Sequence, residues 1–149
     1  KVLKEYLKGT NPEYSLHTQV KGKHLAKYQN RGRFALRPDL MIRLGELNKV
    51  VMDTKWKLLD VDAFNADISQ SDIYQMFAYA KKYLNQPDEG NDVILIYPYQ
   101  DNFDKPLLEP FDLDDGHKLW VVPFSINDSM QSKLLMPDGQ SNDWFVNVL

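Results

Sequence analysis

The sequence contains no cysteine and no long hydrophobic run. The lack of cysteine excludes disulfides, thiolate metal sites and iron–sulfur clusters, and it agrees with the reducing cytoplasm that we expect for this chain. No apolar stretch approaches the roughly 20 residues of a membrane-spanning helix, and no signal-peptide pattern opens the chain, so we expect no membrane partner. A phosphate-binding glycine loop is also missing, because residues 22–24 lack the upstream glycine and the following serine or threonine of that motif.

At 149 residues with 43% hydrophobic content, the chain is large enough for one globular domain. Its net charge of −3 conceals an uneven distribution. Residues 1–57 hold 13 Lys and Arg against 5 Asp and Glu, whereas residues 58–149 hold 5 against 16. This asymmetry indicates one basic surface on a protein kept soluble by acidic residues elsewhere. Chance clustering of charges on solvated faces is the alternative.

The order of the apolar patterns predicts one α/β domain with a mixed central β-sheet flanked by helices. Two strands joined by a turn come first, and two more strands follow a helix. The predicted strands are residues 35–44 and 49–58, joined by the turn-prone residues 45–48, and residues 92–99 and 117–124.

Helical patterns occur in two places. Residues 1–9 have helical spacing and are expected to be the tail of a helix that begins before Lys1, in a longer chain. Ser69 and Asp72 resemble a capping box that opens a second helix ending near Leu84. Residues 21–33 are basic and poorly periodic, and we interpret them as a loop or an irregular strand.

A cluster of charged residues interrupts the first pair of strands. Asp53 and Lys55 share one face of their strand, because strand side chains alternate. If the loop between the strands holds an odd number of residues, Asp39 lies directly opposite Asp53, with Cβ atoms about 5 Å apart. An even loop would offset the two carboxylates by one residue. Opposed carboxylates suit Mg²⁺, which takes one or two of them and keeps waters.

Neighbouring groups could complete such a site. Lys55 would stand close to the ion and stabilise developing negative charge, and the backbone carbonyl of Thr54 could add an oxygen ligand. Gln75 and Tyr79 lie four residues apart, on one stripe at the polar border of the predicted helix. Each feature alone has a simpler explanation: a solvated strand face, a turn at Pro38, or a polar helix border. Their combination in this order favours a site.

This combination resembles the PD-(D/E)xK nuclease superfamily, with Pro38-Asp39 followed by Asp53-Thr54-Lys55. Gln75 to Tyr79 is similar to the QxxxY helix motif of its RecB-like branch. Within the superfamily, the sequence most resembles the McrC family, the nuclease subunits of methylcytosine-specific McrBC restriction systems. The resemblance is strongest over residues 34–83.

The resemblance implies a Mg²⁺-dependent DNA endonuclease with a restriction-endonuclease-like core, formed by residues 1–149 as a single nuclease domain in the C-terminal part of a longer subunit. Mn²⁺ could replace Mg²⁺. The implied partners are DNA and an McrB-like AAA+ GTPase subunit that recognises modified DNA. Family members carry an acidic residue on the first helix, and Glu5 is a poor substitute for it. The implied site residues are Asp39, Asp53 and Thr54 as metal ligands, Lys55 assisting the attacking water, Gln75 in the catalytic set and Tyr79 in support.

Two questions stay open at this stage. Basic residues near aromatic ones suit contacts with DNA phosphates, although a plain basic loop is the alternative. A catalytically inactive nuclease fold that serves in complex assembly or DNA docking is the second function class, and a metal-dependent cleavage assay separates it from the first. The candidate DNA contacts are Lys21, Lys23, Lys27, Arg31, Arg33 and Arg37.

Overall fold

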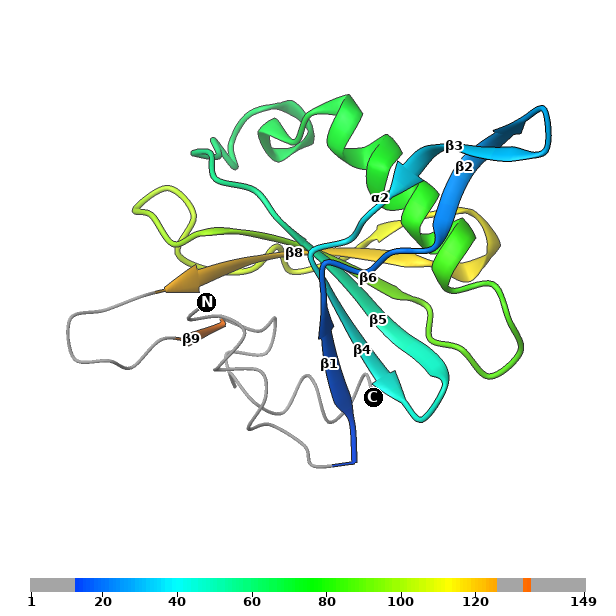
Figure 1. Ribbon diagram of the computed structural model, residues 1–149. Coiled ribbons are helices and arrows are strands. Elements are labelled where there is room, and N and C mark those ends of the chain that lie inside the picture. The colour runs from blue at the N-terminus through cyan, green and yellow to red at the C-terminus, as the bar shows by residue number, and fades with distance from the viewer. Residues whose placement is uncertain (1–12, 126–132, 135–149) are drawn as a thin grey trace.

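The computed structural model describes residues 13–125 and 133–134 and consists of a β-sheet, one α-helix packed on it and a separate hairpin (Figure 1). In this part of the chain the helix is α2 (Gln70–Tyr83), and two short 3₁₀ turns are η1 (Phe64–Asp67) and η2 (Asp114–Gly116). The strands are β1 (Ser15–Thr18), β2 (Lys23–Tyr28), β3 (Arg31–Leu36), β4 (Leu40–Leu44), β5 (Leu47–Thr54), β6 (Asp92–Pro98), β7 (Phe111–Asp112), β8 (Lys118–Ser125) and β9 (Lys133–Leu134).

The central sheet is mixed, as predicted. Its strand order is β1-β4-β5-β6-β8-β7, and β9 also pairs with β8. β5, β6 and β8 run parallel to one another, whereas β4 is antiparallel to β5. β6 lies in the middle of the parallel part and its residues 93–97 are all buried, which explains its continuous apolar run.

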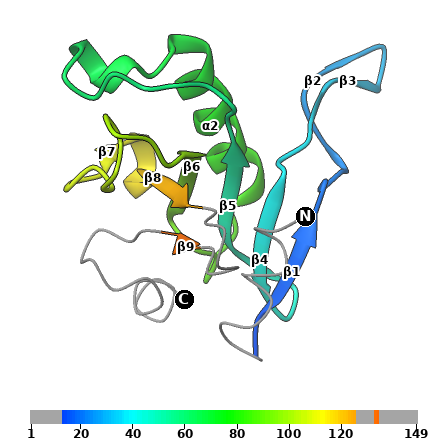
Figure 2. The ribbon, with the colours of Figure 1, turned by 90° about the vertical axis from the view of Figure 1, so that its left-hand side faces the viewer.

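α2 connects β5 to β6 and covers one face of the sheet (Figures 1 and 2). The predicted cap is confirmed, since the backbone N–H of Asp72 donates to the Ser69 hydroxyl over 3.1 Å. The helix buries an apolar stripe against β5 and β6. Tyr79, expected at the polar border, is only 2% exposed. The buried residues of the helix are Met76, Tyr79, Ala80 and Tyr83.

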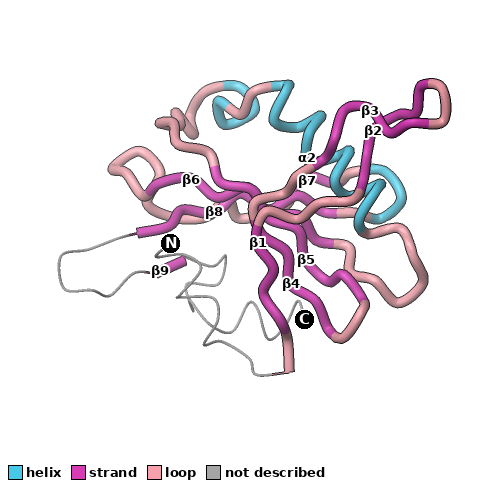
Figure 3. Tube along the Cα trace, in the orientation of Figure 1, coloured by secondary structure: helices cyan, strands magenta, loops and turns pink. Residues whose placement is uncertain are grey.

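The expected arrangement of helices is only partly visible. Within the described residues one α-helix lies on the sheet, drawn in cyan in Figure 3, where the sequence indicated flanking helices. The helix predicted over residues 1–9 lies outside the described residues. No helix in the described part of the chain is long and apolar enough to cross a membrane.

The first two predicted strands are antiparallel neighbours, but their bounds differ from the prediction. Residues 37–39 interrupt the first one, because Pro38 has no amide hydrogen for a strand ladder. Residues 35 and 36 consequently belong to β3, and β4 begins at Leu40. The turn is also shorter than expected: Leu44 pairs with Leu47 across two residues, the first of which, Gly45, has a φ of +60°.

Residues 21–33 were interpreted as a loop or an irregular strand, and the structure shows that most of them form a hairpin of β2 and β3. The two strands pair antiparallel and form a sheet of their own. Gln29 and Asn30 make the turn with φ values of 50° and 62°, as a two-residue hairpin of type I′ requires. All six residues of β2 are exposed, so no apolar alternation marks it in the sequence.

Candidate active site

The register of the β4–β5 hairpin decides whether Asp39 and Asp53 face each other. Leu44 pairs with Leu47 across the two-residue turn. If this pairing continued without interruption, Asp39 would lie opposite Met52. A turn of this length by itself therefore gives the offset arrangement that would separate the carboxylates.

A β-bulge corrects this offset. The register shifts between Ile42 and Arg43, which leaves Lys49 as an extra residue on β5. From there on the pairing is displaced by one residue, and the position opposite Asp39 becomes that of Asp53. Continued by one residue beyond the last pair, Leu40 and Met52, this register puts the two aspartates opposite each other as expected, but the cause is a bulge inside the strand pair and not an odd loop.

The two aspartates face the side of the sheet that α2 covers. Met41 of β4 and Val51 of β5 pack in the core cluster beneath the helix. Strand side chains alternate, so Asp39 and Asp53, each two residues away on the same strand or its extension, point to the same side. The site therefore lies under the first half of α2, at the carboxyl end of β5.

Lys55 links the sheet to the helix. Its Nζ lies 2.7 Å from Oδ2 of Asp53 and donates to Oε1 of Gln75 over 2.6 Å. Nε2 of Gln75 in turn donates to the hydroxyl of Tyr79 over 2.9 Å. The shared strand face of Asp53 and Lys55 and the approach of Gln75, both predicted, are confirmed. The four side chains form one continuous chain of contacts.

Asp39 is held by a different set of partners. Its Oδ2 accepts hydrogen bonds from the backbone N–H of Thr54 over 3.0 Å and from the Thr54 hydroxyl over 2.7 Å. Its Oδ1 accepts from Nε2 of Gln19 over 3.1 Å. Thr54 therefore orients Asp39, a role that the sequence did not suggest, and Gln19 was not predicted at all. The ligand role of the Thr54 carbonyl stays a prediction.

Asp72 is a second site residue, besides Gln19, that sequence reasoning missed. It was assigned only to the helix cap, yet its Oδ1 lies 3.5 Å from Nζ of Lys55 and its Oδ2 lies 3.9 Å from Nζ of Lys57. One signal was available: Asp72 precedes Gln75 by three residues and so shares its helical stripe. Lys55 consequently lies between two carboxylates, one from the sheet and one from the helix.

Burial controls the charges of the site. Asp53 is only 4% exposed, and burial raises its pKa; the nearby Asp39 carboxylate raises it further, while the bond to Lys55 opposes the rise. Burial lowers the pKa of Lys55, but its contacts with Asp53 and Asp72 outweigh this, so the net shift is upward and the ammonium is retained. Burial, followed by the charges of Asp53 and Asp39, also raises the pKa of Tyr79.

The donor set fits a hard divalent cation held by two carboxylates. Asp53 is a buried carboxylate whose pKa is raised in part by the negative charge of Asp39, and a cation between the two would relieve both effects. Mg²⁺ commonly uses one or two carboxylates and leaves its other positions to water and phosphate. Among the described residues no group of three His, Cys, Asp or Glu residues is arranged to bind a metal. Glu5 lies outside these residues.

The six candidate DNA contacts are all exposed; they lie on the β2–β3 hairpin or directly beside it. The hairpin projects from the sheet beside α2 (Figures 1 and 2). Its base is fixed to the helix, because the hydroxyl of Tyr83 donates to the backbone carbonyl of Leu36 over 2.6 Å. The chain then enters the site at Asp39, so the hairpin is anchored next to the proposed metal ligands.

Replacing Tyr83 by phenylalanine should weaken this anchor. The substitution leaves the carbonyl of Leu36 without its partner, so we expect the free energy of unfolding to fall by about 1 kcal/mol in urea titrations. Tyr74→Phe on the same helix is the control. Tyr74 is 63% exposed, so the loss of its hydroxyl should change the free energy of unfolding little. Equal effects of the two substitutions would contradict the anchoring role.

Comparisons with known proteins identify a family and a similar fold. A sequence model described as McrBC 5-methylcytosine restriction system component matches residues 1–98, the segment that carries all the site residues named above. A solved structure, the refined half-complex from the tetradecameric assembly of Thermococcus gammatolerans McrB AAA+ hexamers with bound McrC, has a chain of similar fold. The TM-score is 0.60 at 15% identity, and the match covers 99% of this chain and 31% of that chain.

No curated protein matches the chain. The family match nevertheless spans well over half of its length, and it includes the Asp39, Asp53 and Lys55 motif and the Gln75 to Tyr79 motif. The resemblance seen in the sequence is thereby confirmed at the level of the family. This chain belongs to the McrBC 5-methylcytosine restriction system component family.

Proposed function

We propose that this chain is the nuclease part of a methylcytosine-dependent restriction complex and hydrolyses DNA phosphodiester bonds with Mg²⁺, as a PD-(D/E)xK enzyme. The observation that carries this proposal is the opposition of Asp39 and Asp53 together with the 2.7 Å contact between Asp53 and Lys55. β-bulges are over-represented next to active sites, where they re-aim a side chain, and this bulge brings Asp39 opposite the buried Asp53.

Each residue of the site would have a distinct role in metal binding or catalysis. Asp39 and Asp53, with the carbonyl of Thr54, would hold Mg²⁺, which when bound supplies positive charge to the phosphate and lowers the pKa of water. The ammonium of Lys55 would orient the attacking water and stabilise negative charge that develops on the phosphate. Gln75 fixes the position of Lys55, and Tyr79 fixes Gln75.

The basic hairpin supports DNA as the substrate. Its strands and flanks carry six Lys and Arg residues, and residues 14–38 contain no Asp or Glu. A two-stranded β-ribbon fits the major groove of B-DNA, and lysine and arginine side chains on it can neutralise phosphates. The hairpin is anchored beside the site, so DNA bound there would lie close to Asp39 and Lys55.

A partner would control the nuclease. The sequence has no nucleotide-binding loop, and residues 58–149 are strongly acidic, which weakens unaided binding to DNA by repulsion. The solved assembly of similar fold contains McrB AAA+ hexamers with bound McrC. We therefore propose an McrB-like AAA+ GTPase as the partner that recognises modified DNA and brings it to this site.

The test is cleavage by the full-length protein with and without its partner. In the presence of Mg²⁺ and methylated DNA, we expect little cleavage by the protein alone and robust cleavage after the GTPase and GTP are added. EDTA should abolish the activity, and Mn²⁺ should restore it. Equal, sequence-indifferent cleavage with and without the partner would show that assembly does not regulate this nuclease.

The second candidate function is an inactive nuclease fold used for assembly or DNA docking. One observation favours it: the site has only two opposed carboxylates, and no group of three metal-binding residues occurs among the described residues. It predicts normal assembly and no metal-dependent cleavage under any condition. The intact set of Asp39, Asp53 and Lys55 supports the active enzyme instead.

A further inference from the structure

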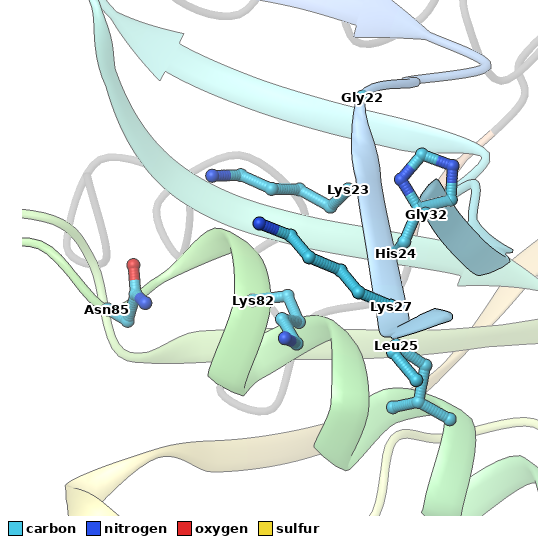
Figure 4. A pocket seen from close by; sticks show the side chains of 9 residues that line it. Gly22, Lys23, His24, Leu25, Lys27, Gly32, Lys82 and Asn85 are labelled. Atoms are coloured by element: carbon cyan, nitrogen blue, oxygen red, sulfur yellow. The ribbon is translucent and has the colours of Figure 1, made fainter. Parts of the chain in front are cut away.

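A pocket lies between the β2–β3 hairpin and the C-terminal end of α2, apart from the site under the first half of the helix. Its volume is about 560 Å³, within the range of sites that hold small molecules or pieces of polymer. Figure 4 shows the side chains of Lys23 and Lys27 extending from the hairpin, above Lys82 and Asn85 at the end of the helix. These four residues are called the lysine pocket below.

The lysine pocket carries uncompensated positive charge. None of the described residues that line it is acidic. Lys57, Lys81 and Lys118 each pair with an aspartate, whereas within the described chain no ion pair involves Lys23, Lys27 or Lys82. Three ammonium groups in one pocket repel one another unless an anion lies between them. The amide of Asn85 adds a neutral donor, so the lining suits an oxyanion and disfavours a cation.

The pocket continues the helical stripe of the active site. Gln75, Tyr79 and Lys82 are spaced by four and three residues, so their side chains leave the helix on the same side. At 1.5 Å per residue, Lys82 lies about 10 Å beyond Gln75 along the axis. Successive phosphates of a B-DNA strand rise 3.4 Å per nucleotide along the duplex axis and also rotate around it, so a separation of this size spans no more than a few nucleotides. A strand entering the site could therefore place another phosphate in the pocket.

We propose that the lysine pocket binds backbone phosphate of the DNA strand that is cut, within a few nucleotides of the scissile bond. This inference rests on the proposed nuclease function and adds Lys82 and Asn85 to the DNA path. It assigns the helix, and not only the hairpin, to DNA binding. Recognition is of the phosphate, so it is independent of base sequence.

Lys82→Gln in the full-length protein tests the inference. Binding of a fluorescein-labelled DNA duplex is measured by anisotropy in EDTA, from 50 to 200 mM NaCl. Loss of one phosphate contact should reduce the slope of log affinity against log salt by about 0.9. Over this fourfold salt range, the variant should therefore lose about 3.5-fold less affinity than the wild type. Lys27→Gln, on the hairpin side of the pocket, should produce the same change.

Lys81→Gln is the matched control. Lys81 neighbours Lys82 on the helix but pairs with Asp115 and lies over the Phe77 ring, 5.4 Å from its centroid, away from the pocket. The same charge is removed, yet the salt slope should not change. Thermal unfolding of each variant checks the fold.

The inference is overturned if Lys82→Gln and Lys81→Gln have equal slopes, or if the wild type binds no DNA at 50 mM salt. Weakened assembly with the partner at unchanged DNA affinity would assign the pocket to a protein and would also overturn it. Cleavage by the partner-bound wild type is measured in parallel. If the wild type cleaves DNA with metal but the Lys82→Gln slope is unchanged, the proposed function holds and the pocket assignment fails. If the slope changes but no cleavage occurs, the pocket binds DNA phosphate and the proposed nuclease function fails.

Discussion

The Lys55→Ala variant should cleave DNA at least about 100-fold more slowly than the wild type, because removing one preorganised donor from a transition state costs about 10²–10³-fold. Nζ of Lys55 contacts both Asp53 and Gln75, and within the described residues no other cationic side chain contacts this pair. The measurement is the initial rate of cleavage by the partner-bound complex with Mg²⁺ and GTP.

Two controls make this result specific. Lys57→Ala removes a lysine from the same segment. Nζ of Lys57 also approaches Asp72, at 3.9 Å, but no ion pair joins it to Asp53. This variant should retain most of the activity. The fold of Lys55→Ala should persist, since the backbone N–H of Lys55 still donates to the carbonyl of Ile96 over 2.9 Å. A folded Lys55→Ala complex that cleaves as fast as Lys57→Ala would refute the assigned role.

Asp53→Asn should abolish stabilisation by Mg²⁺. A ligand that binds only the folded state at 100 times its dissociation constant stabilises it by about 2.7 kcal/mol. The thermal midpoint of the wild type should therefore rise when Mg²⁺ is added, and that of the variant should not. Asp92→Asn is the matched control: burial also raises the pKa of this carboxyl, but it accepts from Nε1 of Trp120 and lies outside the site. Its response to Mg²⁺ should equal that of the wild type.

In EDTA, the Asp53→Asn variant should be more stable than the wild type at neutral pH. The raised pKa of Asp53 means that the folded state holds this proton more tightly than the unfolded state. The ionised carboxylate therefore costs stability above the raised pKa, and the cost disappears as the pH falls below the ordinary value of 3.8. The advantage of Asp53→Asn should narrow as the pH is lowered toward 4. A constant advantage, or a midpoint that still rises with Mg²⁺, would contradict this account.

The fold was most predictable where burial determines the sequence. The apolar run of β6 and the capped helix α2 each have a periodicity that tertiary packing reinforces, and both were located to within a few residues. The hairpin of β2 and β3 was missed for the opposite reason. Its strands bury almost nothing, so no apolar alternation exists, and the only local signal is the turn at Gln29 and Asn30.

The site was predictable where it depends on strand faces and helix stripes. Asp53 with Lys55, and Gln75 with Tyr79, follow from periodicities of two and about four residues. The opposition of Asp39 and Asp53 did not follow, because the bulge at Lys49 leaves no mark that distinguishes it from a regular strand residue. Asp72 was overlooked because its capping position gave a sufficient explanation, and a residue can serve in both ways.

The register set by the bulge restricts how the length of the hairpin between Asp39 and Asp53 can change. A single added or deleted residue would bring Met52 or Thr54 opposite Asp39 and turn the Asp53 carboxylate toward the other face, among the apolar side chains around Ile94 and Val122. Two added residues in the turn would lengthen both strands equally and leave the carboxylates facing each other. Related chains can therefore vary the length of this hairpin in steps of two residues while the two aspartates stay opposite each other.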